Sequence, residues 1–188
     1  LVAVNVQTAL NPASTMKLLT TFAALELLGP AYVWQTESFI SGTLADGVLA
    51  GNLHLRGGGD PKLTYDQFDR LLRQIRARGV RDISGDLVLD RSAFAPGEIE
   101  PGRFDAQPQR PYNVVPDALL LNFKSIRLSL RPDDGSKMLA LTMEPAPANL
   151  DLVNQIRLTY PNSGVCGDWR EKLRADVVAR SAVARLVL

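Results

Sequence analysis

The sequence is poor in the side chains that build metal and redox centres. Its 188 residues include one histidine, His54, and one cysteine, Cys166. A zinc site needs several His or Cys ligands and a cysteine nucleophile needs a histidine base, so this composition argues against a metal centre and against Cys–His chemistry. We therefore expect no metal ion and no cofactor, and we interpret His54, in a strand-like stretch, as structural.

The sequence also lacks a large net charge and a long apolar run. The formal net charge is +1, with 22% charged and 46% hydrophobic residues. No basic stripe argues for a nucleic-acid partner, and no stretch approaches the roughly 18 apolar residues of a transmembrane segment. The remaining possibility is an ordinary globular chain with one core or parts of two smaller domains, of unknown oligomeric state.

The single cysteine has two interpretations. It is either a buried free thiol or half of a disulfide whose partner lies outside this chain, and one cysteine cannot decide the redox compartment. The chain starts with LVAVNVQ and stops at ARLVL, both strand-like, with no signal sequence at its start. We interpret it as a piece of a longer polypeptide.

Apolar periodicity predicts a mixed sequence of strands and helices. We expect helices at 14–28 and 64–79, hairpins at 33–61 (turning at 45–47) and 125–145 (turning at 133–135), an extended proline-rich loop at 95–118, and strands at 1–6, 83–94, 154–160 and 183–188. Within the first hairpin, RGGGDP lacks the lysine of a phosphate loop and is interpreted as a turn. The order shows no regular βαβ alternation, so we predict an α+β fold with a β-rich second half.

A short segment near the start, NPASTMKLLTT, has a spacing used in nucleophilic catalysis. Ser14 and Lys17 are three residues apart, so in a helix they share a face. Ser14 would stand in the first turn, where unpaired N–H groups and the helix dipole stabilise an alkoxide and can bind a substrate oxyanion. Lys17 could accept the serine proton if burial kept its amine neutral.

The same two residues also have a structural interpretation. Ser14 follows Pro12 and would be a good N-cap, and Lys17 would then be a solvated first-turn lysine. An S-x-x-K spacing arises by chance in roughly one such chain in four, so the motif alone is weak. The restricted NPA entry and the apolar residues after Lys17 fit a buried helix, and local physics leaves both interpretations open.

Four segments in order resemble one enzyme family. They are LNPASTMKLLTTFAALELLGP, DGVLAGNLHLRGGGDPKL, GVRDISGDLVLDRSAF and VCGDWREKL. Together they look like the class C penicillin-binding proteins, the DacB-type D-alanyl-D-alanine carboxypeptidase/endopeptidases. The resemblance implies a catalytic domain similar to that of β-lactamases, interrupted by a large insertion. Residues 1–36 would begin the catalytic domain, and residues 37–188 would belong to one or two insertion domains, first mixed α/β and then mostly β.

The resemblance also implies roles for particular residues. Ser14 would be the acylated nucleophile and supply one oxyanion-hole N–H, and Lys17 would be the general base. Asp105 and Tyr112 loosely match positions that contact the free amino group and the stem of the peptide side chain, and a carboxylate suits the diaminopimelate ammonium. The alternative is an ordinary exposed aspartate and a packing tyrosine.

The sequence departs from the family pattern in one respect. The family completes its active site with S-x-N and K-T-G motifs after the insertion, and neither occurs in these 188 residues. We therefore expect this chain alone to be inactive. The resemblance also suggests a disulfide partner for Cys166 just after ARLVL, so we expect Cys166 to be unpaired within this chain.

The function that the resemblance implies is a periplasmic serine-type D-Ala-D-Ala carboxypeptidase/endopeptidase. It would act on peptidoglycan stem peptides through an acyl-enzyme on Ser14, and β-lactam antibiotics would acylate the same serine. One alternative is a non-catalytic module that binds cell wall or a partner protein, motivated by the missing motifs. Another is an esterase or β-lactamase of the same superfamily, which is disfavoured because compact enzymes place the second motif earlier.

Overall fold

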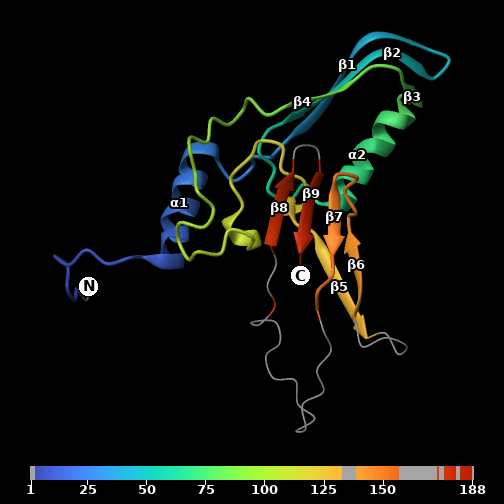
Figure 1. Ribbon diagram of the computed structural model, residues 1–188. Coiled ribbons are helices and arrows are strands. Elements are labelled where there is room, and N and C mark those ends of the chain that lie inside the picture. Colours follow the sequence, from blue (N-terminus) through green and yellow to red (C-terminus); the bar gives the residue numbers. More distant parts are fainter. Residues whose placement is uncertain (1–2, 133–138, 157–172, 174–175, 181–182, 188) are drawn as a thin grey trace. The chain divides into compact units, whose positions relative to one another are not determined.

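The computed structural model describes residues 3–132, 139–156, 173, 176–180 and 183–187 (Figure 1). The chain divides into two compact units, Leu1–Phe123 and Lys124–Leu188, and each is described by itself. The elements of the first unit are η1 (Ala13–Thr15), α1 (Met16–Leu28), β1 (Thr36–Ala45), β2 (Val48–Gly57), α2 (Tyr65–Ala77), β3 (Asp82–Ile83), β4 (Leu87–Asp90) and η2 (Pro111–Asn113). A short turn, η3 (Asn122–Lys124), spans the division, and the predicted boundary between residues 36 and 37 stays a prediction.

The first helix is where the sequence predicts it, but the strand before it is not. The helical region starts at Ala13 and ends at Gly29, whose φ of +79° suits a residue without a Cβ. The predicted strand at 1–6 is wrong for residues 3–6, which form bends and a turn. Asn5 has a φ of +55° and its carbonyl accepts a hydrogen bond from the Thr8 N–H at 2.9 Å, which breaks the extended run.

The hairpin predicted at 33–61 is confirmed by β1 and β2, which pair from Thr36 to Gly57. Ala45 pairs with Val48, so the loop holds two residues, Asp46 and Gly47. Both have positive φ values, +51° and +87°, as a type I′ turn requires. This turn matches the right-handed twist of the strands and fixes the antiparallel register from Ala45 back to Thr36.

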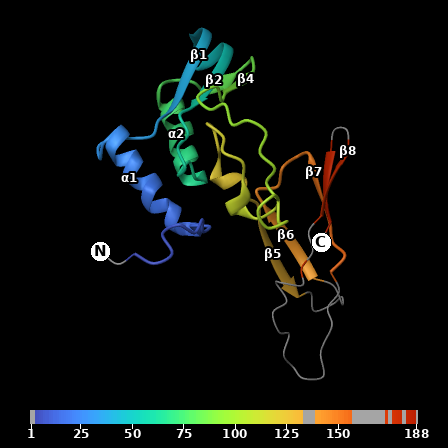
Figure 2. The same cartoon turned by 90° about the vertical axis from the view of Figure 1, so that its left-hand side faces the viewer.

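Helix α2 covers one face of this sheet and makes the core of the first unit (Figure 2). The Thr64 hydroxyl caps the helix by accepting from the Gln67 N–H at 3.5 Å, and Gly79, with a φ of +100°, follows its last turn. The buried core consists of Leu49, Leu53 and Leu55 of β2 with Ile75 and Val80. Phe68 and Leu71 of α2 pack against it, so the apolar face predicted for this helix is the buried one.

The predicted strand at 83–94 is two short strands that run parallel to β2. β3 pairs with β2 at Val48–Leu49 and β4 pairs with it further along, at Leu53–Arg56. Between them the Ser84 N–H donates to the Leu49 carbonyl at 3.0 Å and the Asp86 N–H donates to Asn52 Oδ1 at 2.8 Å. β2, α2 and the two short strands therefore form a βαβ unit, which the sequence pattern did not predict.

The described part of the second unit is built mainly of β-strands. Its described strands are β5 (Arg127–Pro132), β6 (Leu139–Glu144), β7 (Leu150–Val153), β8 (Asp176–Arg180) and β9 (Val183–Val187). β5 and β6 form the predicted second hairpin, whose turn lies outside the described residues. β7 pairs parallel and β8 antiparallel with β9, which confirms the strand predicted at 183–188 over its described part.

Two further predictions in this unit, the strand at 154–160 and the state of Cys166, are not confirmed. The strand predicted at 154–160 is wrong for residues 154–156, because the strand in this region, β7, ends at Val153. Residues 157–160 lie outside the described part of the chain. Cys166 also lies outside it. The mixture of helices and strands confirms the α+β class. Among the described residues, no helix is long and apolar enough to cross a membrane.

Candidate active site

Ser14 stands in a tight turn that leads directly into α1. Asn11 Oδ1 accepts from the Ala13 N–H at 2.9 Å, and the Pro12 carbonyl accepts from the Thr15 N–H at 2.9 Å. Ala13 has a φ of +44°, so the chain turns sharply immediately before the serine. The NPA segment thus builds the entry to the helix, and Ser14 occupies its first turn as the sequence predicts.

Lys17 lies one turn further along and reaches back to the serine. Its Nζ donates to Ser14 Oγ at 3.4 Å, a long hydrogen bond between two exposed side chains. This is the contact that a proton transfer between a serine and a lysine needs. The spacing predicted from sequence therefore brings the two groups together.

The surroundings of this pair are apolar but open within the described part of the chain. α1 has no buried side chain there. Its exposed apolar residues point in all directions around the helix: Met16, Leu18, Leu19, Phe22, Leu25, Leu27 and Leu28. A helix that is apolar all round is of the kind found inside a larger core. The burial that would keep Lys17 neutral is thus not supplied by these residues.

The structure also brings Asp105 and Tyr112 together, seven residues apart in the proline-rich loop. The Tyr112 hydroxyl donates to Asp105 Oδ2 at 2.6 Å. Asp105 Oδ1 accepts from Asn113 Nδ2 at 2.8 Å and from the Gln107 N–H at 2.9 Å. The half-buried carboxylate is held in place by three donors from its own loop.

Two of these donors, Tyr112 and Asn113, also line a pocket of about 530 Å³. The other lining residues include apolar and charged side chains: Ile99, Pro101, Phe104, Val114, Glu100 and Arg103. An apolar pocket with a few polar groups can hold a flexible chain that ends in a charged group. No motif or periodicity in the sequence singles out Asn113, so it was not among the predicted site residues.

The contact with Tyr112 changes the acidity of both groups. The hydrogen bond from the Tyr112 hydroxyl is the main reason why the pKa of the Asp105 carboxyl lies below its usual value. Partial burial opposes this, and the donors from Gln107 and Asn113 add to it. The same contact raises the pKa of Tyr112. Asp105 is therefore a carboxylate near neutral pH and suits a cation.

We expect Tyr112→Phe to raise the pKa of Asp105, because it removes the strongest donor to the carboxylate. The folded-state pKa is depressed, so the stability from this contact is present above the unfolded pKa of about 3.9 and is lost as pH falls through the folded value. NMR titration of the carboxyl carbon measures the change. Phe104→Leu is the control, and an identical Asp105 titration in Tyr112→Phe would contradict the assignment.

Other polar contacts lie elsewhere in the first unit. The single histidine, His54, is on β2 and shares a 2.9 Å hydrogen bond with Ser41 Oγ of β1. This cross-strand contact fits the structural interpretation of His54. The described part of the chain holds no group of three or more His, Cys, Asp or Glu side chains able to bind a metal ion.

Comparison with known proteins finds one peptidase family and relatives that are carboxypeptidases. The model of the D-Ala-D-Ala carboxypeptidase 3 (S13) family matches residues 1–171. The D-alanyl-D-alanine carboxypeptidase DacB of Haemophilus influenzae is 40% identical over 91 residues, which are 48% of this chain and 19% of that protein. A D-alanyl-D-alanine carboxypeptidase of Actinomadura sp. is 39% identical over 85 residues, 45% of this chain and 16% of that protein.

Solved structures resemble the fold over nearly the whole chain. The crystal structure of penicillin binding protein 4 (dacB) from Haemophilus influenzae matches with a TM-score of 0.68 and 25% identity, over 95% of this chain and 38% of that one. The same protein complexed with a β-lactam matches with a TM-score of 0.57, over 94% of this chain and 35% of that one.

The relatives named here are D-alanyl-D-alanine carboxypeptidases and a penicillin binding protein. The match of the family model over residues 1–171 shows that the chain belongs to the D-Ala-D-Ala carboxypeptidase 3 (S13) family. The matched regions are less than a fifth of the curated relatives' length, and the matched part of the solved chain is 38%.

Proposed function

We propose that the full-length protein is a periplasmic serine-type D-Ala-D-Ala carboxypeptidase/endopeptidase that acts on peptidoglycan stem peptides. The observation that carries the proposal is the 3.4 Å contact between Lys17 Nζ and Ser14 Oγ at the start of an apolar helix. Membership of the S13 family supports it independently. S-x-N and K-T-G do not occur in these 188 residues, so of the family's catalytic groups they would supply the nucleophile and its base.

The two residues divide the first chemical step between them. Neutral Lys17 takes the proton from Ser14 Oγ, and the oxygen attacks the carbonyl carbon of the penultimate D-alanine. The Ser14 N–H, in the first turn of the helical region, donates to the oxyanion that forms. The peptide bond then breaks, the leaving D-alanine takes a proton, and an ester to Ser14 remains. Water hydrolyses this ester and returns the free serine.

A β-lactam would follow the same first step. Its strained amide carbonyl takes the place of the peptide carbonyl, Ser14 attacks it and the ring opens, which leaves an acyl-enzyme. The β-lactam complex of the structurally similar Haemophilus influenzae protein supports this part of the proposal. The experiment that tests the function is D-alanine release and covalent labelling by a fluorescent penicillin, both measured on the full-length protein.

We further propose that Asp105 binds the side-chain ammonium of the stem peptide's diaminopimelate. Oδ1 accepts two hydrogen bonds and Oδ2 accepts one from the Tyr112 hydroxyl, so a carboxylate with about four acceptor sites keeps capacity for an ammonium donor. Tyr112 and the pocket beside it would hold the aliphatic stem. The Asp105 charge is retained near neutral pH because its pKa is low.

We expect Asp105→Asn to lower the preference for a free side-chain amine. In full-length protein, the ratio of kcat/KM for a D-Ala-D-Ala peptide with a free diaminopimelate amine to that for its N-acetylated form should fall by about 10-fold to 100-fold, the loss of one charge-assisted hydrogen bond. Asp86→Asn, at an exposed carboxylate before β4, is the matched control and should leave the ratio unchanged. An unchanged ratio in Asp105→Asn would remove Asp105 from the substrate site.

A second candidate is a non-catalytic module that binds cell wall or a partner. The exposure of the Ser14–Lys17 pair within the described residues favours it. The same assays separate the two functions. A catalytic protein releases D-alanine and retains the label on Ser14, whereas a binding module retains peptide without releasing D-alanine.

A further inference from the structure

The proline-rich loop that carries Asp105 is closed at its base by an ion pair. Arg91 directly follows β4 and Asp117 ends the loop, 26 residues later. Arg91 Nη1 donates to Asp117 Oδ2 at 2.9 Å, and Asp117 Oδ1 accepts from the Leu119 N–H at 3.0 Å. The Asp117 side chain is 25% exposed and the Arg91 side chain is 63% exposed, so the carboxylate end of this pair is the better shielded from water.

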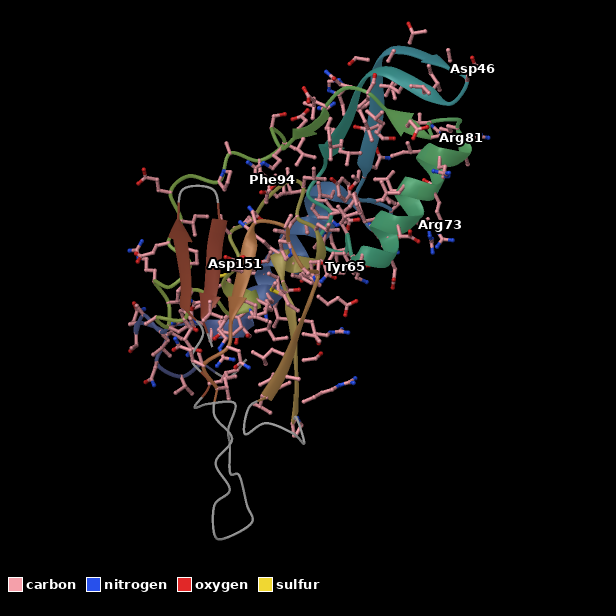
Figure 3. All side chains as sticks on the ribbon, turned by 45° about the vertical axis from the view of Figure 1, so that its right-hand side comes forward. Asp46, Tyr65, Arg73, Arg81, Phe94 and Asp151 are labelled. Carbon is pink, nitrogen blue, oxygen red and sulfur yellow. The ribbon has the colours of Figure 1, made fainter. Side chains whose placement is uncertain are left out.

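A second set of contacts joins the same base to the end of β2. The ring of Phe94 lies over Gly59 so closely that a Cβ there would meet it at 2.3 Å (Figure 3 labels Phe94). The Gly59 N–H donates to the Ala118 carbonyl at 2.8 Å. A Cβ on Gly57 would come within 2.1 Å of the Ala118 carbonyl oxygen, so the glycine run lets the returning chain lie directly against β2.

The loop between these ends is organised by its own side chains. The hydrogen bonds around Asp105 come from Gln107, Tyr112 and Asn113, all within the loop. They hold Tyr112 and Asn113, two of the residues that line the pocket, whereas the contacts at the base join the loop to the sheet. A change at the base would thus move Asp105 without altering its own hydrogen bonds.

We infer that Arg91 and Asp117 form a clasp that positions the loop, and with it Asp105, for recognition of the substrate's side-chain amine. Both are positioning residues, since they act on the substrate through the loop. The inference rests on the proposed function and deepens it. Its signature is a change in substrate preference at constant reactivity of Ser14, because the clasp orients the side-chain subsite and Ser14 lies in η1, the turn before α1.

The test uses full-length protein carrying Arg91→Ala, Arg91→Lys or Asp117→Ala. The readout is the ratio of kcat/KM for the free-amine peptide to that for its N-acetylated form, in which the concentration of active enzyme cancels. Arg91→Ala should lower this ratio by about tenfold, mainly by raising KM for the free-amine peptide, since a displacement of about 1 Å weakens a positioned contact. Arg91→Lys, which keeps the charge, should retain most of the ratio, and the rate of penicillin labelling should stay unchanged in both.

Two further variants separate a clasp from a general loss of stability. Arg73→Ala removes an Arg–Asp pair of similar length, 2.8 Å to Asp69 on the exposed face of α2 (Figure 3 labels Arg73), and should leave the ratio unchanged. The double variant Arg91→Ala/Asp117→Ala should lower the ratio no more than either single variant, because both remove one contact.

Three results would overturn the clasp. The first is an unchanged ratio in Arg91→Ala while Asp105→Asn lowers it, which leaves the substrate site in place. The second is an equal loss in Arg91→Ala and Arg73→Ala. The third is an unchanged ratio in Asp105→Asn itself, which removes the subsite that the clasp would position and is distinguishable because D-alanine release continues.

Discussion

Replacing Ser14 with alanine is expected to abolish labelling of the full-length protein by a fluorescent penicillin and to lower D-alanine release by at least about a thousandfold. The substitution removes the oxygen that forms the acyl bond, and loss of a catalytic nucleophile alone costs that much or more in serine enzymes. The backbone turn that places residue 14 depends on Asn11 and Pro12 and is left intact. The variant should therefore fold and still fail to acylate.

The neighbouring hydroxyl provides a matched control. Thr15 lies in the same turn, is also exposed and is one residue from the nucleophile, and its side chain makes no capping hydrogen bond. Thr15→Ala should retain labelling and turnover close to the original values. Labelling of Ser14→Ala as strong as that of the unchanged protein would rule out Ser14 as the acylated residue.

The elements that could be predicted best from the sequence are those in which particular residues require one backbone conformation. Asp46-Gly47 can adopt two successive positive φ values, so the turn and with it the whole β1–β2 register follow from two residues. α2 was predictable because its cap, its apolar stripe and its terminal glycine agree on the same 13-residue helix. In such stretches, local preference and tertiary structure give the same answer.

The predictions for residues 1–6 and 83–94 failed for the same physical reason. Whether and how a segment pairs in a sheet depends on partners that are distant in the sequence. LVAVNV has the composition of a strand, but residues 3–6 have no described ladder to join and Asn5 turns the chain. The parallel pairing of β4 with β2 depends on α2 carrying the chain back across the sheet. Neither the alternation of 83–94 nor that of the hairpin specifies this pairing.

In the candidate site, too, local contacts could be predicted from the sequence and contacts between distant residues could not. Ser14 and Lys17 were identifiable because one helical turn brings them together. Asp105 and Tyr112 were assigned through family resemblance, and their 2.6 Å contact depends on the course of a loop with five prolines between residues 95 and 118. The Arg91–Asp117 pair spans 26 residues and carries no local signal, so it emerged only from the structure.

A second large effect is expected in the core that supports this loop. Leu49 of β2 is fully buried among Leu44, Ile75 and their neighbours, and Leu49→Ala should destabilise the first unit by about 2–5 kcal/mol. The substitution removes a buried side chain and leaves a cavity between the sheet and α2. Hydrogen exchange of the β2 amides in the full-length protein measures the loss, because it reports the opening of this unit separately from the rest of the chain.

The control for this prediction is a leucine on the same sheet with a different environment. Leu87 of β4 pairs with Leu53 but is 55% exposed, so Leu87→Ala should change the opening free energy by less than about 1 kcal/mol. Because β2 ends at Gly57, two residues before Gly59 at the loop base, Leu49→Ala should also accelerate exchange at the Gly59 amide, which donates to Ala118. Equal effects of the two substitutions, or a Gly59 amide that exchanges as before, would show that the loop base is anchored independently of the core.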